Sequence, residues 1–150
     1  MPTIYDELRA SHERQRALCR SMSASRSAPA KRRQAFLELA IELDAHAAAE
    51  ERFLYVPMLM LDGGLSVSRH AMSEHHEIEE MVEETRGVNP ETETFHTQAQ
   101  DLGHLVRHHL KEEEQGFFQL SGRLLSAPQK ADLRKRYLAD YERLKAQATG

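Results

Sequence analysis

The chain has 150 residues, of which 40% are apolar, an ordinary globular composition that predicts one domain over residues 1–150. Its longest apolar run, from Phe53 to Leu61, is too short to cross a membrane, because a span needs about 20 apolar residues. A net charge of −4 disfavours a nucleic-acid binder, and a single cysteine excludes both an internal disulfide and a zinc site made of cysteines. Because no basic start is followed by an apolar stretch, we expect a cytoplasmic protein without a secretory signal.

Residues that favour helices dominate the sequence, and β-branched residues are too sparse and scattered to predict strands. Prolines and glycines punctuate the chain and mark the connections between periodic stretches. We therefore predict five helices, over residues 3–23, 30–60, 66–86, 91–122 and 128–147.

Apolar residues recur at three- and four-residue spacing in each of the first four predicted helices. In the helix 30–60, for example, this stripe passes through Phe36 and Leu39 and continues to Phe53 and Pro57. Amphipathic helices joined by short connections are typical of an antiparallel bundle. The sequence thus predicts an all-α fold: an antiparallel up-down four-helix bundle over about residues 3–122, with an additional C-terminal helix lying against it.

Six polar residues interrupt the apolar stripes. Each of the four helices contributes one histidine at a core position, and two of them also contribute a glutamate four residues later on the same face. Burying carboxylates and imidazoles is costly, whereas metal ions neutralise the carboxylates and use the imidazole lone pairs. We therefore interpret the six as metal ligands and assign no separate catalytic residue: His12, His46, Glu50, His75, His109 and Glu113.

The choice between neighbouring histidines depends on the helix face. His75 continues the apolar stripe that passes through Val82, whereas His76 leads to a run of glutamates. In the same way His109 lies on the apolar stripe of its helix, whereas His108 shares its side with charged residues. The other three histidines are expected at the surface: His70, His96 and His104.

The number of donors predicts the number of ions. One tetrahedral zinc ion needs about four ligands, so six over-supply it. Two octahedral ions offer about twelve positions, and four imidazoles, two bridging carboxylates and a bridging solvent oxygen leave roughly two of them free. The sequence therefore predicts a carboxylate-bridged pair of ions with an open edge, and a single zinc ion remains an alternative. A donor set without sulfur suits iron, manganese, zinc, copper or nickel.

Four motifs occur in a fixed order: a single His12, then His46-Ala-Ala-Ala-Glu50-Glu51, then Glu74-His75-His76, and finally His109-Leu-Lys-Glu-Glu113-Glu114. This order resembles the hemerythrin-like HHE cation-binding domain over nearly the whole chain, including a tail helix. The resemblance implies a four-helix bundle that holds a non-haem di-iron centre. By that analogy the four histidines are terminal ligands, and Glu50 and Glu113 bridge the irons.

The resemblance also implies the uses known for the family, which are oxygen carriage, sensing of oxygen or nitric oxide, iron handling and redox protection. Oxygen carriers of the family have a second histidine where this chain has Ala71, and a His-x-x-x-x-Asp step where it has His109 and Glu113. Fewer imidazoles leave a more open and more oxidisable site. This difference favours oxidation or iron handling over reversible oxygen carriage.

We expect two Fe ions, with Zn or Mn as possible substitutes, that bind a small diatomic ligand or peroxide rather than support rapid turnover. The alternatives are a weak di-metal oxidase or peroxidase and a single-zinc structural helical bundle. We expect neither a nucleic acid nor a membrane as partner, and a monomer or weak homodimer. Glu51 and Glu114 follow the two bridging glutamates, and each is either a hydrogen-bond acceptor for a ligand histidine or a solvated surface charge.

Overall fold

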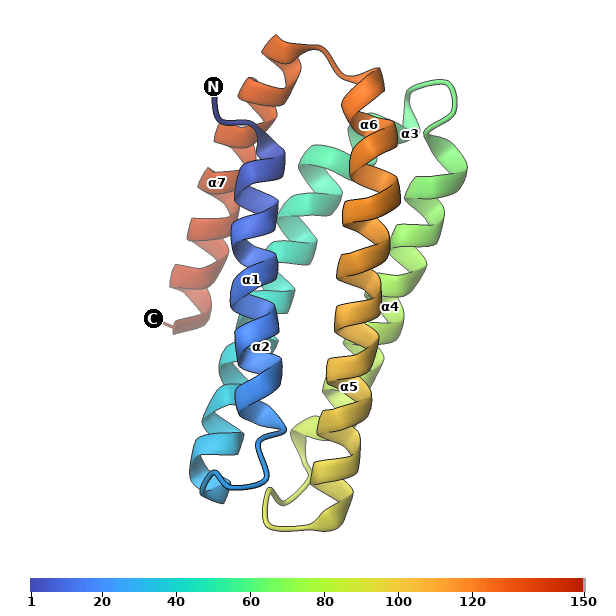
Figure 1. Cartoon of the computed structure of the whole chain (residues 1–150). Helices are drawn as coiled ribbons and strands as arrows, with labels where there is room; N and C mark the ends of the chain where they lie inside the picture. The colour runs from blue at the N-terminus through green and yellow to red at the C-terminus, as the bar shows by residue number, and fades with distance from the viewer. Residues whose placement is uncertain (150) are drawn as a thin grey trace.

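The computed structural model describes residues 1–149, which form five long helical segments (Figure 1). Three of these are uninterrupted: α1 (Ile4–Met22), α4 (Leu65–Arg86) and α7 (Ala127–Thr149). The other two each contain one π-helical turn: α2 (Pro29–Glu50) continues through η1 (Glu51–Tyr55) into α3 (Val56–Leu59), and α5 (Glu93–Glu112) continues through η2 (Glu113–Phe117) into α6 (Phe118–Leu124). The predicted all-α class is confirmed, and the predicted helix boundaries are correct to within a few residues.

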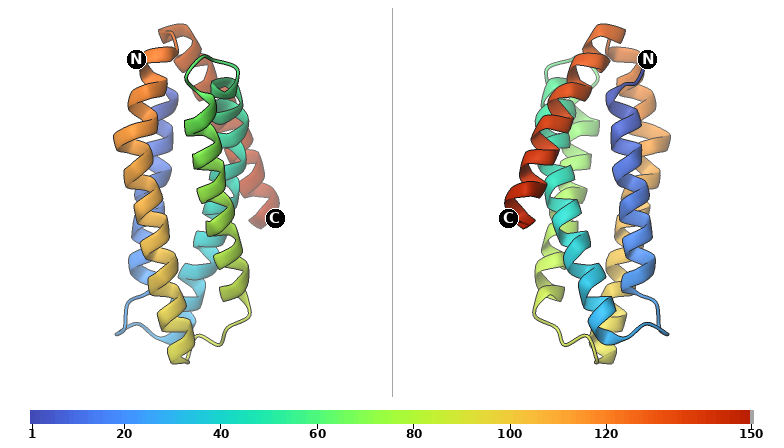
Figure 2. Two further views of the ribbon diagram at one scale, coloured as in Figure 1. Left: turned by 90° about the vertical axis from the view of Figure 1, so that its right-hand side faces the viewer. Right: turned by 90° about the vertical axis from the view of Figure 1, so that its left-hand side faces the viewer.

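Four of the segments form the bundle. α1 packs against α2 and α5, and α4 packs against α5 and, less extensively, against α2. Successive segments run in opposite directions, with their connections at alternating ends (Figures 1 and 2). α7 lies outside these four, against α1, α2 and η1. The predicted up-down bundle with an additional C-terminal helix is therefore confirmed. Within residues 1–149, no helix is both long and apolar enough to pass through a bilayer.

Local sequence signals begin and end these helices. The backbone N–H of Thr3 donates to the Asp6 carboxylate at 2.7 Å, which forms a capping box at the start of α1. The Thr92 hydroxyl accepts from the backbone N–H of Phe95 at 3.2 Å and caps α5. Gly63 has a φ of 86° in the turn between α3 and α4, a left-handed conformation that favours glycine.

A layer of polar side chains divides the core into two apolar clusters. One cluster includes Leu8 and Met58 and is joined by Tyr137 from α7. The other includes Cys19 and Phe95 and fills the opposite end of the bundle. On α1, on α4 and at the α5–η2 junction, buried histidine or glutamate residues lie along the chain between the two clusters. Apolar packing therefore closes the polar layer from both ends.

The two π turns lie at the level of this polar layer. The predicted apolar stripe continues to Phe53 and Pro57, but the structure leaves these two only half-buried and buries Tyr55 and Met58 instead. A π turn takes up an extra residue, so the inward face moves along the chain beyond it. The assumption of a regular helix was wrong at this point, and the shift brings a tyrosine hydroxyl into the interior.

A buried carboxylate joins α7 to the bundle. Glu42 on α2 accepts hydrogen bonds from the Ser11 hydroxyl at 2.6 Å, the Tyr141 hydroxyl at 2.5 Å and the Lys145 ammonium at 2.9 Å. Burial alone would raise the pKa of this carboxyl, but the three donors outweigh burial and hold the pKa below its ordinary value. The ionised form of Glu42 is therefore the form that stabilises the packing of α1, α2 and α7.

We expect a Glu42→Gln variant to be less stable than the wild type by about 2 kcal/mol near neutral pH, because charged hydrogen bonds are lost. A carboxylate with a lowered pKa stabilises the fold fully above its unfolded pKa and loses that contribution as the pH falls through the folded pKa. The difference should therefore shrink as the pH is lowered below about 4.5. Urea unfolding across this pH range measures it. Glu38→Gln, an exposed change on the same helix, is the matched control, and a pH-independent Glu42→Gln effect would contradict the assignment.

Candidate metal centre

The six residues predicted as metal ligands all lie in the polar layer, and each is at most 8% exposed. The structure draws them from four of the five helical segments, as the sequence predicts. They are His12 on α1, His46 and Glu50 on α2, His75 on α4, His109 on α5 and Glu113 at the start of η2. Each histidine lies near the middle of its segment, so the donors meet at one level of the bundle.

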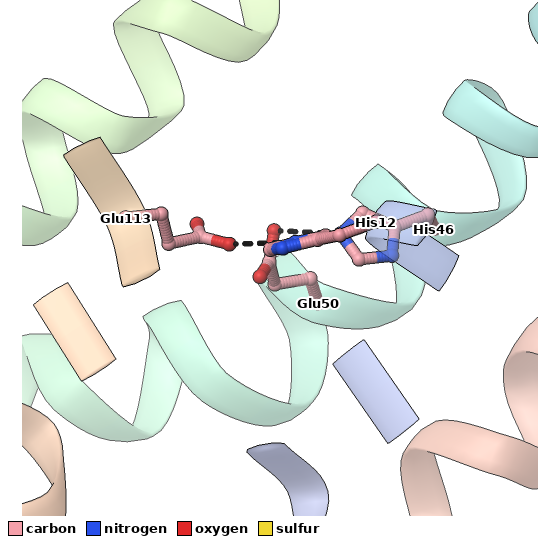
Figure 3. A group of neighbouring side chains, drawn as sticks. All are labelled: His12, His46, Glu50 and Glu113. Carbon is pink, nitrogen blue, oxygen red and sulfur yellow. Dashed lines mark ion pairs between the residues drawn. The ribbon is translucent and has the colours of Figure 1, made fainter. Parts of the chain in front are cut away.

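The first group of donors is shown in Figure 3 and consists of His12, His46, Glu50 and Glu113. One donor atom from each residue lies within 4.8 Å of the other three. The Nε2 atom of His12 is 3.2 Å from Oε1 of Glu113, and Nε2 of His46 is 3.3 Å from Oε1 of Glu50. Both imidazoles thus turn the same nitrogen towards a carboxylate.

The second group consists of Glu50, His75, His109 and Glu113, again with donor atoms within 4.8 Å of one another. The Nε2 atom of His75 is 3.2 Å from Oε1 of Glu50, and Nε2 of His109 is 3.6 Å from Oε2 of Glu113. Both glutamates therefore belong to both groups. Because each carboxylate has two oxygens, Glu50 and Glu113 are placed to connect two adjacent cation positions.

Glu51 and Glu114 fix the outer nitrogens of two of the imidazoles. Nδ1 of His12 is 2.7 Å from the Glu114 carboxylate, and Nδ1 of His75 is 3.0 Å from that of Glu51. Of the two alternatives open from the sequence, the hydrogen bond to histidine is the one observed. An acceptor at Nδ1 holds the proton there and leaves Nε2 free as a lone-pair donor.

The other two imidazoles have partners that the sequence analysis missed. Nδ1 of His46 is 3.0 Å from the hydroxyl of Tyr137, which lies on α7. Nδ1 of His109 is 2.9 Å from the carboxylate of Glu74 on α4. The only sequence signals were the core position of Tyr137 on the tail helix and the position of Glu74 next to His75. All four imidazoles are therefore oriented from outside by a separate side chain.

Five inward-facing atoms of the six predicted ligands are left without hydrogen bonds. These buried atoms are Nε2 of His12, His46 and His109, Oε2 of Glu50 and Oε1 of Glu113. An unpaired buried polar group costs about 1–3 kcal/mol. Cations in this layer would accept all of these lone pairs and neutralise both carboxylates, so the residues fit a metal centre.

The carboxylates make this interior attractive to positive charge. Burial opposes a charge on His12, but Glu113 and Glu114 outweigh burial and raise the pKa of the imidazole to about 9. Burial of His75 is likewise outweighed by neighbouring carboxylates, which raise the pKa of that imidazole to about 10. Without a cation, protons supply this positive charge, and a cation would replace them.

The structure adds a tyrosine to the site. The Tyr55 hydroxyl is fully buried and shares its single proton between Oε1 of Glu50, at 3.0 Å, and the Glu113 carboxylate; its oxygen is 3.3 Å from Nε2 of His75. Burial and the two glutamates raise the pKa of this phenol, so it keeps its proton beside bare carboxylates. The sequence analysis missed Tyr55 because only the π turn of η1 directs it inward.

A cavity of about 290 Å³ gives access to donors of both groups. His46, His75 and His109 line it on the polar side, and Ile78 and Val82 are among its apolar walls. The space is large enough for a small molecule, and charged residues such as Asp44 and Glu79 line it beside the apolar ones. The centre is therefore buried and still accessible.

The remaining histidines lie outside this centre. The side chains of His76 and His108 are 69% and 62% exposed, so the choice of His75 and His109 as the inward residues agrees with the structure. Surface positions were predicted for the other three histidines. The structure leaves His70 and His104 exposed and His96 half-buried.

The fold and the buried histidine and glutamate groups agree with comparisons to known proteins. The Hemerythrin HHE cation binding domain matches residues 3–121, and the chain belongs to this family. The family resemblance expected from the motifs is thus confirmed, and together with the buried histidine and glutamate groups it indicates metal binding. The matched region ends before α7, so Tyr137 lies outside the part of the chain that the family describes.

Two known proteins are similar to this chain along nearly its whole length. A DNA nickase of Nostoc sp. (strain PCC 7120 / SAG 25.82 / UTEX 2576) is 27% identical over an alignment 151 residues long, which covers 98% of this chain. The chain spans only 42% of the length of that protein. The crystal structure of a hemerythrin HHE cation binding domain-containing protein from Mycobacterium kansasii superposes with a TM-score of 0.83 and 22% identity, covering 99% of this chain and 91% of that one. This second likeness shows a shared fold.

Proposed function

We propose that the protein holds a carboxylate-bridged pair of iron ions and uses it to bind or react with dioxygen, peroxide or nitric oxide. The observation that carries the proposal is the convergence of four inward-facing imidazoles on two shared, buried carboxylates. Each group of donors would hold one ion, and Glu50 and Glu113 would bridge the two. Helical bundles build di-iron and di-manganese centres from these two residue types, histidine and glutamate, projecting inward from facing helices.

The distribution of unpaired atoms favours two ions over one. A single tetrahedral ion in the first group would satisfy His12 and His46 but leave Nε2 of His109 buried and unpaired. A single ion in the second group would leave Nε2 of His12 and of His46 buried and unpaired. Two adjacent ions satisfy both groups, because the glutamates supply one oxygen to each.

The donor chemistry suits iron, with manganese and zinc as competitors. Imidazole nitrogens and carboxylate oxygens are present, and no sulfur atom belongs to either donor group. When bound, a pair of iron ions supplies electrons to a small oxidant. The chain's own contribution is to hold the donors in a buried layer and to keep a proton on the Tyr55 hydroxyl beside both glutamates.

Sensing, iron handling and redox protection are the uses that this centre supports. Ala71 occupies a buried position on α4 one turn before His75, where a further imidazole would fill a coordination position, so the ions keep open positions for a ligand. The partner is a small diatomic molecule or peroxide, for which the cavity has ample room. The excess of acidic residues disfavours a nucleic acid as partner. We propose a monomer or weak homodimer in the cytoplasm.

Elemental analysis of protein purified without added metal tests the proposal. We expect about two iron ions per chain, and fewer than about one and a half ions would contradict a bridged pair. Oxidised iron protein should absorb visible light. Zinc gives no such absorption, because it has a filled d shell and no redox chemistry. Colourless protein with one zinc per chain would instead support the structural zinc bundle. Sustained loss of added peroxide would identify a weak peroxidase rather than a binding protein.

A Tyr137→Phe variant is expected to bind its metal about 10–100-fold more weakly than the wild type, because the hydroxyl no longer orients His46. Equilibrium competition with a chelator measures this change. Tyr141→Phe is the control, since Tyr141 stacks on Tyr137 and anchors α7 through Glu42 but contacts none of the six donors. Equal weakening in both variants would mean that α7 acts only by its packing.

A further inference from the structure

A second set of imidazoles and carboxylates lies on the outer face of α4 and α5. His70 and Glu74 are four residues apart on α4, and His108 and Glu112 are four residues apart on α5. Residues at this spacing share one helix face, so each helix presents one imidazole and one carboxylate to the other. The donor atoms of His70, Glu74 and Glu112 lie within 4.8 Å of one another.

Glu112 lies between the two imidazoles and pairs with each through a different oxygen. Nε2 of His70 is 2.8 Å from Oε1 of Glu112, and Nε2 of His108 is 3.0 Å from Oε2 of the same residue. Oε2 of Glu74 is 3.7 Å from the His70 nitrogen and 3.8 Å from the His108 nitrogen. A tetrahedral ion with bonds of about 2.1 Å holds its donors about 3.4 Å apart, so small side-chain adjustments bring the atoms of His70, Glu74 and Glu112 to coordination distance. His108 lies outside this group of three and joins it only if its exposed side chain moves further.

Glu74 connects this surface set to the inner centre. Its other oxygen, Oε1, is 2.9 Å from Nδ1 of His109, whose Nε2 faces the interior. A cavity of about 430 Å³ is lined by His70, Glu74 and Glu112 of the outer set and by His109 and Glu113 of the inner one. A continuous space therefore leads from solvent-exposed donors to buried ones.

We propose that His70, Glu74 and Glu112, with His108 beside them as a fourth donor, form an exchangeable site for a divalent transition-metal cation that loads the inner centre. The two imidazoles select first-row transition metals over calcium and magnesium, which prefer oxygen alone. The side chains of His70 and His108 are 60% and 62% exposed, so the ion stays open to solvent and exchanges quickly. The loading role rests on the proposed function, whereas the existence of the site does not.

The test is Co²⁺ binding to metal-free protein, measured by equilibrium dialysis and by the rise of cobalt absorption after rapid mixing. We expect the wild type to bind two cations tightly and one more weakly, and a His70→Ala/His108→Ala variant to lose the weak one. The variant should also fill its inner centre about tenfold more slowly, while reaching the same final occupancy. Because both substituted side chains are exposed, helix content should be unchanged by circular dichroism.

A His76→Ala variant provides the matched control. Nε2 of His76 is 2.7 Å from Oε1 of Glu80, which lies four residues later on α4. Among the described residues no third donor joins this exposed pair. The control should bind and load Co²⁺ like the wild type. Identical cation numbers in the wild type and the double variant would overturn the site, and identical loading rates would overturn its loading role. A wild type that binds one cation, lost in the double variant, would support the site and overturn the inner centre.

Discussion

A Glu50→Gln variant is expected to lose both inner cations, whereas a His12→Ala variant loses one. Glu50 is fully buried and belongs to both groups of donors, so removing its charge deprives each ion of a bridging oxygen. His12 belongs to the first group alone. Elemental analysis should give about two ions for the wild type, about one for His12→Ala and fewer than about half an ion for Glu50→Gln.

Glu51→Gln is the graded control for this comparison. Glu51 follows Glu50 directly, but it contacts only the outer nitrogen of His75, at 3.0 Å. We expect this variant to keep about two ions with an affinity lowered about 10–100-fold, since it loosens a ligand without removing one. If Glu50→Gln and His12→Ala each lost a single ion, Glu50 would not be a shared bridge.

Removal of the metal is expected to lower the unfolding temperature by roughly 10 °C. Ligands present at about 1,000 times their dissociation constant stabilise a fold by about 4 kcal/mol, and each kcal/mol shifts the unfolding temperature of a chain of this size by about 2–4 °C. Without cations, Oε2 of Glu50 and Oε1 of Glu113 are left buried and unpaired. Thermal unfolding followed by circular dichroism, before and after treatment with a chelator, measures the shift.

Two comparisons show whether such a shift comes from the inner centre. Zn²⁺ added back in slight excess should restore the unfolding temperature, because zinc accepts the same nitrogen and oxygen donors. Glu50→Gln should respond little to the chelator, because it has few inner ions to lose. An unfolding temperature that is the same with and without the chelator would show that protons alone satisfy the polar layer.

The inward direction of most donors was predictable because helical periodicity is a local property. A residue three or four positions from an apolar core residue points the same way, which was enough to choose His75 over His76 and His109 over His108. The same argument failed where the helix is not regular. Tyr55 lies beyond the end of α2 in a π turn, and a prediction from uniform spacing placed Phe53 on the inward face instead.

The sequence by itself determined the helices, their amphipathic faces and the six polar residues that point into the bundle. Only the tertiary structure decided that Tyr137 reaches His46 across 91 residues of chain, that Glu74 holds His109, and that the outer faces of α4 and α5 bring four further donors together. The physical reason is that side-chain direction around a helix follows from local geometry. The distance between side chains of different helices depends on how packing sets the rotation and axial register of each helix.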